Sequence, residues 1–300
     1  MEKLADRILK GAIDIHAHSY PEHTLSTDPR LDSLEWAKMA KEYGMRGFVM
    51  TSHIWPTVVQ AYEISKVISD IAVMGSITLN FTVGGLSPMA VAIAGELGGK
   101  IVFMPTWSAH NDITRSGVML NRIRKICPQV DRTIQEAGGG ISVLDSRGEV
   151  KEVVKEIFST AKAYGMAVSS GHLSIEESMQ LAKLASATKV AFILSHPHNR
   201  TISATREQQK IIAEAGGFVE HTFIACMPMH LRVDPKEIAQ SIAAVGVDHT
   251  IMTSDAFGPW NPPAPEILRM FIESMLALGL GEADIRRMVC TNPARVLNLE

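Results

Sequence analysis

Two histidines, His16 and His18, lie one residue apart at the end of the short segment AIDIHAH, residues 12–18. Alternate residues of a β-strand project from the same face, so Asp14, His16 and His18 are expected to point the same way. Two neutral imidazoles and a carboxylate suit Zn²⁺, and also Mn²⁺ or Fe²⁺, whereas Ca²⁺ and Mg²⁺ prefer oxygen ligands alone. The pair is therefore a candidate metal site, although each histidine taken singly also fits a hydrogen-bonded structural role.

Polar residues of similar kinds close five further apolar segments of the chain. They are His53, Gly171-His172, Ser195-His196, Glu220-His221 and Ser254-Asp255. In a barrel of parallel strands, all the C-terminal strand ends face one mouth, where the active sites of such barrels lie. Glu220 and His221 must point to opposite faces of their strand, and Glu220 is the one we expect to face inward. The placement of these residues, more than their number, favours one shared site.

The segments that carry these residues alternate with amphipathic stretches, a pattern typical of βα units and a parallel sheet. Strands are expected over residues 11–18, 45–53, 73–81, 100–107, 166–172, 189–197, 216–223 and 248–255. Eight such units in 300 residues fit a closed (β/α)8 TIM barrel better than an open doubly wound sheet. The sequence therefore predicts a single α/β barrel domain over residues 1–300.

The regular alternation is interrupted after the fourth expected strand. Residues 107–148 are expected to form an insertion of roughly 40 residues over one face, containing a small hairpin that turns at residues 146–148. This insertion contributes Trp107 and His110, and the last barrel loop contributes Trp260. Together with His53 and Glu220, these residues are candidates for substrate binding, because aromatic and polar groups around a pocket suit a small planar or cyclic molecule.

The composition excludes several classes of function. The formal net charge is −3 and the basic residues are scattered, so no nucleic-acid partner is expected. The N-terminus has charges spread through it and no segment is long and apolar enough for a membrane helix, which predicts a cytoplasmic protein without a membrane partner. Three widely spaced cysteines indicate neither a disulfide framework nor a structural zinc site.

The order of these motifs resembles the amidohydrolase superfamily of metal-dependent hydrolases. The resemblance rests on His16-Ala-His18, His172, His196 and Asp255 at the ends of the first, fifth, sixth and eighth strands, and on a C-terminal helical "NPA" segment within residues 286–299. The stretches FTVGGLSPMAV, IVFMPT and SGHLSIEE look like a poorly characterised branch of it. The resemblance implies a TIM barrel and supplies little about the substrate.

The resemblance also implies which residues hold the metal and which act on the substrate. His16, His18, His172 and Asp255 would be the ligands, with Asp255 also serving as general base or mainly orienting the attacking water. His196 would stabilise the charge that builds on the substrate oxygen, or would be a further ligand.

One departure from the two-metal members concerns the end of the fourth strand. That strand ends in Met104-Pro105-Thr106, where the two-metal members carry a bridging Lys or Glu. Moving the strand to residues 141–146 would present Asp145 instead. A single divalent metal is therefore expected, with zinc ahead of manganese or iron.

Three functions remain open at this stage. The first is a hydrolase that uses a metal-activated water to attack a C–N bond, in an amide, lactam or related cyclic amide, or to open a lactone of a small molecule. The second is a metal-dependent decarboxylase of a small carboxylic acid. The third is a barrel that binds a metal or ligand without turnover, against which the presence of both His196 and Asp255 argues. A homo-oligomer is expected, because large barrels often assemble through their outer helices.

Overall fold

The strands of the computed structural model, which describes residues 3–18, 20–25, 31–258 and 260–299, all pair in parallel. All eight expected strands are present, and the third is split in two. The strands are β1 Ile13–His18, β2 Gly47–Thr51, β3 Ala72–Met74, β4 Ser76–Thr78, β5 Ile101–Phe103, β6 Ala167–Ser169, β7 Phe192–Ser195, β8 Phe218–Thr222 and β9 Thr250–Thr253. The mixed α/β class with a parallel sheet is confirmed.

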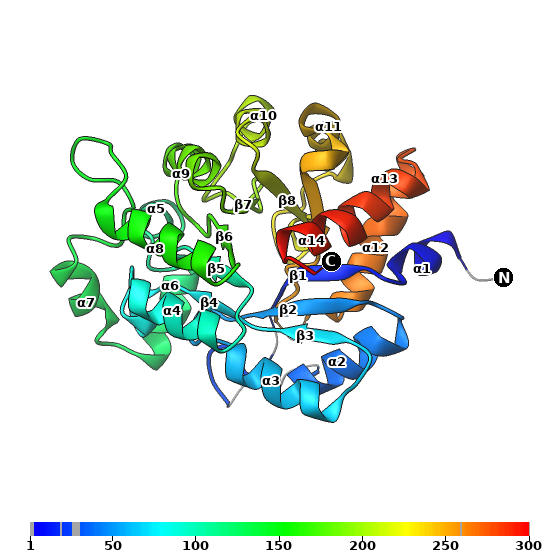
Figure 1. Ribbon diagram of the computed structural model, residues 1–300, viewed down its shortest axis with the longest axis horizontal. Helices are drawn as coiled ribbons and strands as arrows, with labels where there is room; N and C mark the ends of the chain where they lie inside the picture. The colour runs from blue at the N-terminus through cyan, green and yellow to red at the C-terminus, as the bar shows by residue number, and fades with distance from the viewer. Residues whose placement is uncertain (1–2, 19, 26–30, 259, 300) are drawn as a thin grey trace.

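Helices follow the strands and lie around them, as Figure 1 shows. Three of them, α2, α9 and α10, begin at capping boxes, at Asp32, Ser174 and Thr205 respectively. The helices are α1 Leu4–Leu9, α2 Ser33–Glu42, α3 Val58–Val67, α4 Pro88–Glu96, α5 His110–Arg115, α6 Val118–Ile126, α7 Val130–Glu136, α8 Glu152–Ala163, α9 Ile175–Thr188, α10 Arg206–Glu214, α11 Pro235–Val245, α12 Ala264–Ala277, α13 Glu282–Arg286 and α14 Asn292–Val296, with short 3₁₀ turns η1 Phe81–Val83, η2 Phe223–Cys226 and η3 Val247–His249 and a π-helical turn η4 Arg287–Thr291.

The strands form two sheets, in the orders β1-β2-β3 and β4-β5-β6-β7-β8-β9. Only Gly75 separates β3 from β4, so one sheet continues into the other along the chain. At the opposite edges, the N–H of His18 donates to the carbonyl of Ala256 at 3.0 Å, and the N–H of Asp255 donates to the carbonyl of His16 at 2.9 Å. The ends of β1 and β9, which carry the candidate ligands, are therefore held together by backbone hydrogen bonds.

The chain between β5 and α8 contains more than the expected small hairpin. It contains α5, α6 and α7, and the apolar residues of this segment form a small core of their own with Trp107, Met119, Leu120, Ile123, Val130 and Ile134. The turn near residues 146–148 is present, but one antiparallel bridge between Leu144 and Val150 is the pairing there. The fourth expected strand is β5 at Ile101–Phe103, as first placed. The alternative strand at residues 141–146 is not formed, and Asp145 lies in the turn. The helical spacing of Met119, Leu120 and Ile123 was the overlooked signal.

A β-bulge in β1 changes which residues face the site. The pairing of β1 with β2 slips by one residue between Asp14 and Ala17, so the simple alternation of faces ends there. Asp14 lines a small buried space together with Trp36 of α2 and Pro265 of α12, on the helix side of the strand. The expectation that Asp14 points the same way as His16 and His18 is therefore wrong.

Candidate metal centre

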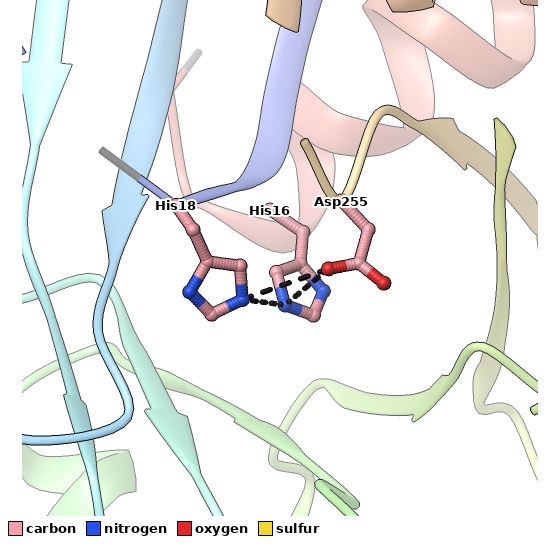
Figure 2. Close-up of side chains that lie close together, drawn as sticks. All are labelled: His16, His18 and Asp255. Atoms are coloured by element: carbon pink, nitrogen blue, oxygen red, sulfur yellow. Dashed lines mark hydrogen bonds and ion pairs between the residues drawn. The ribbon is translucent and has the colours of Figure 1, made fainter. Parts of the chain in front are cut away.

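Three side chains from the two ends of the chain converge at the joined ends of β1 and β9. Figure 2 shows His16, His18 and Asp255 pointing toward one another. The two Nε2 atoms of the histidines are 3.2 Å apart, and each lies 3.5 Å from Oδ1 of Asp255. All three residues are buried. We refer to His16, His18 and Asp255 as the triad.

The dimensions of the triad match those of a tetrahedral metal site. Ligand atoms bound tetrahedrally at about 2.0–2.1 Å from a zinc ion lie about 3.3 Å from one another. The three separations in the triad, 3.2, 3.5 and 3.5 Å, are close to that edge length. The donor set of two imidazoles and one carboxylate is also one that Zn²⁺, Mn²⁺ and Fe²⁺ accept. The residues therefore fit a divalent transition metal.

The backbone turns sharply where two of the candidate residues leave their strands. Asp255 has φ = 49° and His196 has φ = 31°, in the left-handed region that side-chain-bearing residues rarely adopt. Such conformations cost about 1–3 kcal/mol each and are found preferentially at functional sites. Folding is thus made less favourable locally at Asp255 and His196, the two residues to which the resemblance assigns proton transfer and charge stabilisation.

His16 is held from behind by Glu220 of β8. Nδ1 of His16 lies 2.9 Å from Oε1 of Glu220, and Thr253 donates a second hydrogen bond to the same oxygen. Burial lowers the pKa of His16, but the carboxylates of Glu220 and Asp255 outweigh it and raise the pKa to about 9. A proton shared with Glu220 leaves Nε2 as the ligand atom of the imidazole, which is the arrangement found around many metal-bound histidines.

The variant Glu220→Gln should bind metal about 10- to 100-fold more weakly than the wild type, because supporting carboxylates of metal-bound histidines contribute that much. Glutamine keeps the size of the side chain and removes its charge. Competition titration of metal-free protein with zinc and a chelator of known affinity measures the change. Glu207→Gln, on the exposed face of α10, is the matched control and should leave the affinity unchanged. Equal zinc affinities for Glu220→Gln and wild type would contradict this role of Glu220.

His18 has a carboxylate partner that the sequence analysis missed. Oε1 of Glu22 lies 3.4 Å from Nδ1 of His18 and accepts the backbone N–H of His53 at 2.9 Å. Burial raises the pKa of Glu22, but the neighbouring His18 outweighs it and lowers the pKa below its usual value. His18, Glu22 and His53 each offer a ligand atom within 4.8 Å of the others. The hydrogen bond to His53 fixes Glu22 between the loops after β1 and β2. In this position its carboxylate can support the imidazole of His18 from the Nδ1 side.

His172 and His196 line the same cavity as the triad and lie beside it. Their ring centroids are 5.0 Å apart, and the ring of His196 is 5.8 Å from that of His16. Nδ1 of His172 lies 3.2 Å from Oδ1 of Asp112, which comes from α5 in the inserted segment. Burial and the neighbouring His172 hold the pKa of His196 well below its usual range, so His196 is neutral at pH 7. Among the described residues, the tight ligand cluster that includes Asp255 does not include His172.

Gly171 sets the position of His172. Its φ is +56°, and a Cβ atom there would overlap the carbonyl oxygen of Met104 and lie 2.7 Å from that of Pro105. We expect Gly171→Ala to lower the free energy of unfolding by about 1–3 kcal/mol more than Gly165→Ala, because only the first also creates overpacking. Gly165 has a similar φ of +63°, and its nearest neighbour would be an ordinary 3.6 Å away. Urea unfolding of both variants measures the difference, and equal stabilities would contradict the steric argument.

A cavity of about 320 Å³ lies in front of the triad, His172 and His196. His53 also lines it, and its role in substrate binding stays a prediction. Burial and the neighbouring His18 hold the pKa of His53 well below its usual range.

The other four substrate-binding candidates lie elsewhere. Trp107 is buried in the core of the inserted segment, where its indole N–H donates to the carbonyl of His53. The ring of His110 contacts the carbonyl of Gly139, and Trp260 is 80% exposed. Glu220 is buried behind His16. None of the four lines the cavity, so their expected role is corrected: a strand-end or loop position alone does not say which side chains the packing leaves open.

Comparisons with protein families and curated proteins give one family match. Residues 11–220 match a family described as a family of unknown function, DUF6282. No curated protein matches the chain. Among the described residues, no helix has the length and apolar character needed to cross a membrane.

Solved structures match over nearly the whole chain. A probable dipeptidase from Pseudomonas aeruginosa is 11% identical with a TM-score of 0.65, covering 98% of this chain and 96% of that one. An amidohydrolase from the same organism is 13% identical with a TM-score of 0.60, covering 98% and 97%. A 2,6-dihydroxybenzoate decarboxylase from Rhizobium is 10% identical with a TM-score of 0.56, covering 97% and 99%. At these identities the likeness is one of fold, and at that level the expected resemblance to amidohydrolases is confirmed.

Proposed function

The chain belongs to DUF6282, a family of unknown function, and we propose that it is a metal-dependent hydrolase of a small molecule. One observation carries the proposal. Two imidazoles and a carboxylate, drawn from opposite ends of the chain, meet at tetrahedral ligand spacing beside a cavity of about 320 Å³. A purely structural cluster would not need an open space in front of its ligand atoms.

For the architecture, we propose a single (β/α)8 barrel domain. The continuity of β3 into β4 and the backbone hydrogen bonds between the ends of β1 and β9 support closure of the two sheets into one ring. In a barrel, the site would lie at the C-terminal mouth, where the active sites of this architecture lie.

His16, His18 and Asp255 would hold one divalent metal, zinc in the first place and manganese or iron as alternatives. His172, which lines the same cavity, would complete the ligand set. Its Nδ1 is engaged with Asp112, so Nε2 is the atom left to bind. When bound, the metal supplies Lewis-acid polarisation of the substrate and of the attacking water.

Asp255 and His196 would carry the proton and the charge. The Asp255 carboxylate would take the proton from the attacking water and pass it to the leaving nitrogen or oxygen. The neutral imidazole of His196 would donate a hydrogen bond to the carbonyl oxygen of the substrate as negative charge builds there, a contact that contributes roughly 3 kcal/mol in comparable sites. The products would be an acid and an amine from an amide, an amino acid from a lactam, or a hydroxy acid from a lactone.

A second candidate is decarboxylation of a small carboxylic acid. The observation that favours it is the match in fold to the Rhizobium decarboxylase over nearly the full length of both chains. The same triad would serve: the C–C bond to the carboxylate would break, carbon dioxide would leave, and a proton would take its place on the carbon.

Elemental analysis and a substrate panel test the proposal together. We expect close to one transition metal per chain after purification or reconstitution, and ring opening of cyclic amides or lactones that stops on chelation. Release of carbon dioxide from aromatic acids, without ring opening of the other compounds, would replace the hydrolase by the decarboxylase. Protein that neither retains nor binds Zn²⁺, Mn²⁺ or Fe²⁺ would contradict both.

A further inference from the structure

Two arginines line the cavity without an acidic partner. They are Arg122 of α6 and Arg200 in the loop after β7. By contrast, Arg124 contacts Asp131, and Arg206 contacts Glu237. Within the part of the chain that the structure describes, neither Arg122 nor Arg200 makes such an ion pair. Unpaired guanidinium groups at the wall of a cavity are suited to bind an anion.

Arg122 lies over the ring of Phe257, which also approaches the triad. The guanidinium carbon of Arg122 is 5.7 Å from the centre of the Phe257 ring, a cation–π distance. The same ring lies 6.0 Å, centre to centre, from the imidazole of His18 and 4.9 Å from that of His230. Arg122 and His18 thus approach the same aromatic ring, and Arg122 lines the same cavity as the triad.

The carboxylates of the cavity are already engaged, which leaves the arginines as the unmatched charges. Asp255 faces the two histidines of the triad, and Asp112 faces His172 and accepts a hydrogen bond from Thr201. The walls between are partly apolar and include Met119, Ile224 and Phe257. The cavity therefore suits a molecule with an apolar body and an anionic end.

We propose that Arg122, assisted by Arg200, binds an oxyanion of the substrate, a carboxylate or a phosphate, at the end remote from the bond that is cleaved. The substrate class is then a small amphiphilic acid whose anionic group does not itself react. The inference rests on the proposed function for the reaction, but the anion site itself needs no turnover and no metal. The inserted segment would then take part in substrate binding, since Arg122 belongs to its helix α6.

Isothermal titration calorimetry with three probes that share a phenyl group tests the proposal. The probes are 3-phenylpropanoate, its uncharged amide and phenyl phosphate, titrated at low ionic strength into zinc-loaded and metal-free protein. We expect the better-bound anion to bind at least about tenfold more tightly than the amide, as charge-assisted hydrogen bonds allow. The anion that binds better identifies the oxyanion as carboxylate or phosphate.

The variant Arg122→Met should lose this preference for the anion in both forms of the protein. Arg124→Met, on the same helix but with its guanidinium paired to Asp131, is the matched control and should keep it. An amide bound as tightly as both anions, or a preference that survives in Arg122→Met, would overturn the proposal. A preference that depends on Arg122 in protein that binds no metal would support the anion site while contradicting the proposed hydrolase, so the two failures are distinguishable.

Discussion

The variant Asp255→Asn is expected to lower kcat by about 10²- to 10⁴-fold, the range that a positioned proton acceptor contributes. Asparagine has the size of aspartate and keeps an oxygen that can lie 3.5 Å from the Nε2 atoms of His16 and His18. It cannot take a proton from the attacking water. The loss should therefore appear in the rate per bound metal, measured with whichever lactone or cyclic amide the wild type opens.

Metal content separates a chemical effect from a structural one in this variant. We expect Asp255→Asn to retain metal when zinc is supplied in excess, because both imidazoles remain. An unchanged kcat per bound metal would show that Asp255 is a ligand alone and that the base lies elsewhere. The left-handed φ of 49° at this position is one that asparagine also tolerates, so the fold should be preserved.

The variants His16→Asn and His18→Asn are expected to abolish near-stoichiometric metal binding. Each removes one of the two Nε2 atoms that lie 3.2 Å apart in the triad. The loss should exceed the about 10- to 100-fold expected for a supporting carboxylate, because a ligand itself is removed. At position 16, asparagine can still donate to Glu220, so that buried carboxylate keeps a partner.

Thermal unfolding with added zinc measures the loss of metal binding in His16→Asn and His18→Asn. A metal that binds the folded state alone stabilises it by about 4 kcal/mol when its free concentration is 1,000 times Kd. The wild type should therefore show a zinc-dependent rise in Tm that both variants lack. His110→Asn, an exposed histidine outside the cavity, is the matched control and should respond to zinc like the wild type. A full zinc response in His16→Asn and His18→Asn would remove the triad as the metal site.

Much of the scaffold could be predicted because its signals are local. The apolar runs that became β1 to β9 and the caps of α2, α9 and α10 depend on residues a few positions apart. The positions of His172, His196 and Asp255 just after their strands also follow from these runs. Their arrival at one cavity required the further expectation of a parallel barrel, which supplies a common mouth.

The structure of the inserted segment was harder to predict from the sequence, because this segment forms its own small core. Its three helices bring Asp112 to His172 and place Arg122 on the cavity wall. Neither arrangement has a signature in the sequence. Asp112 and His172 are about 60 positions apart, and Arg122 is more than 100 positions from each residue of the triad. The same holds for Glu22, which is close to His18 in the chain but reaches it only through the path of the loop after β1.

The sequence by itself determined the residue types of the site, the order of the strands and the strand ends at which the chemistry is placed. Only the tertiary structure decided which side chains share a face and which lie close enough together to hold a metal. The bulge in β1 turned Asp14 away from His16 and His18, and packing left His172 outside the triad. The physical reason is that periodicity sets the direction of a side chain only while the pairing register holds, whereas distances between strands depend on the packing of the whole chain.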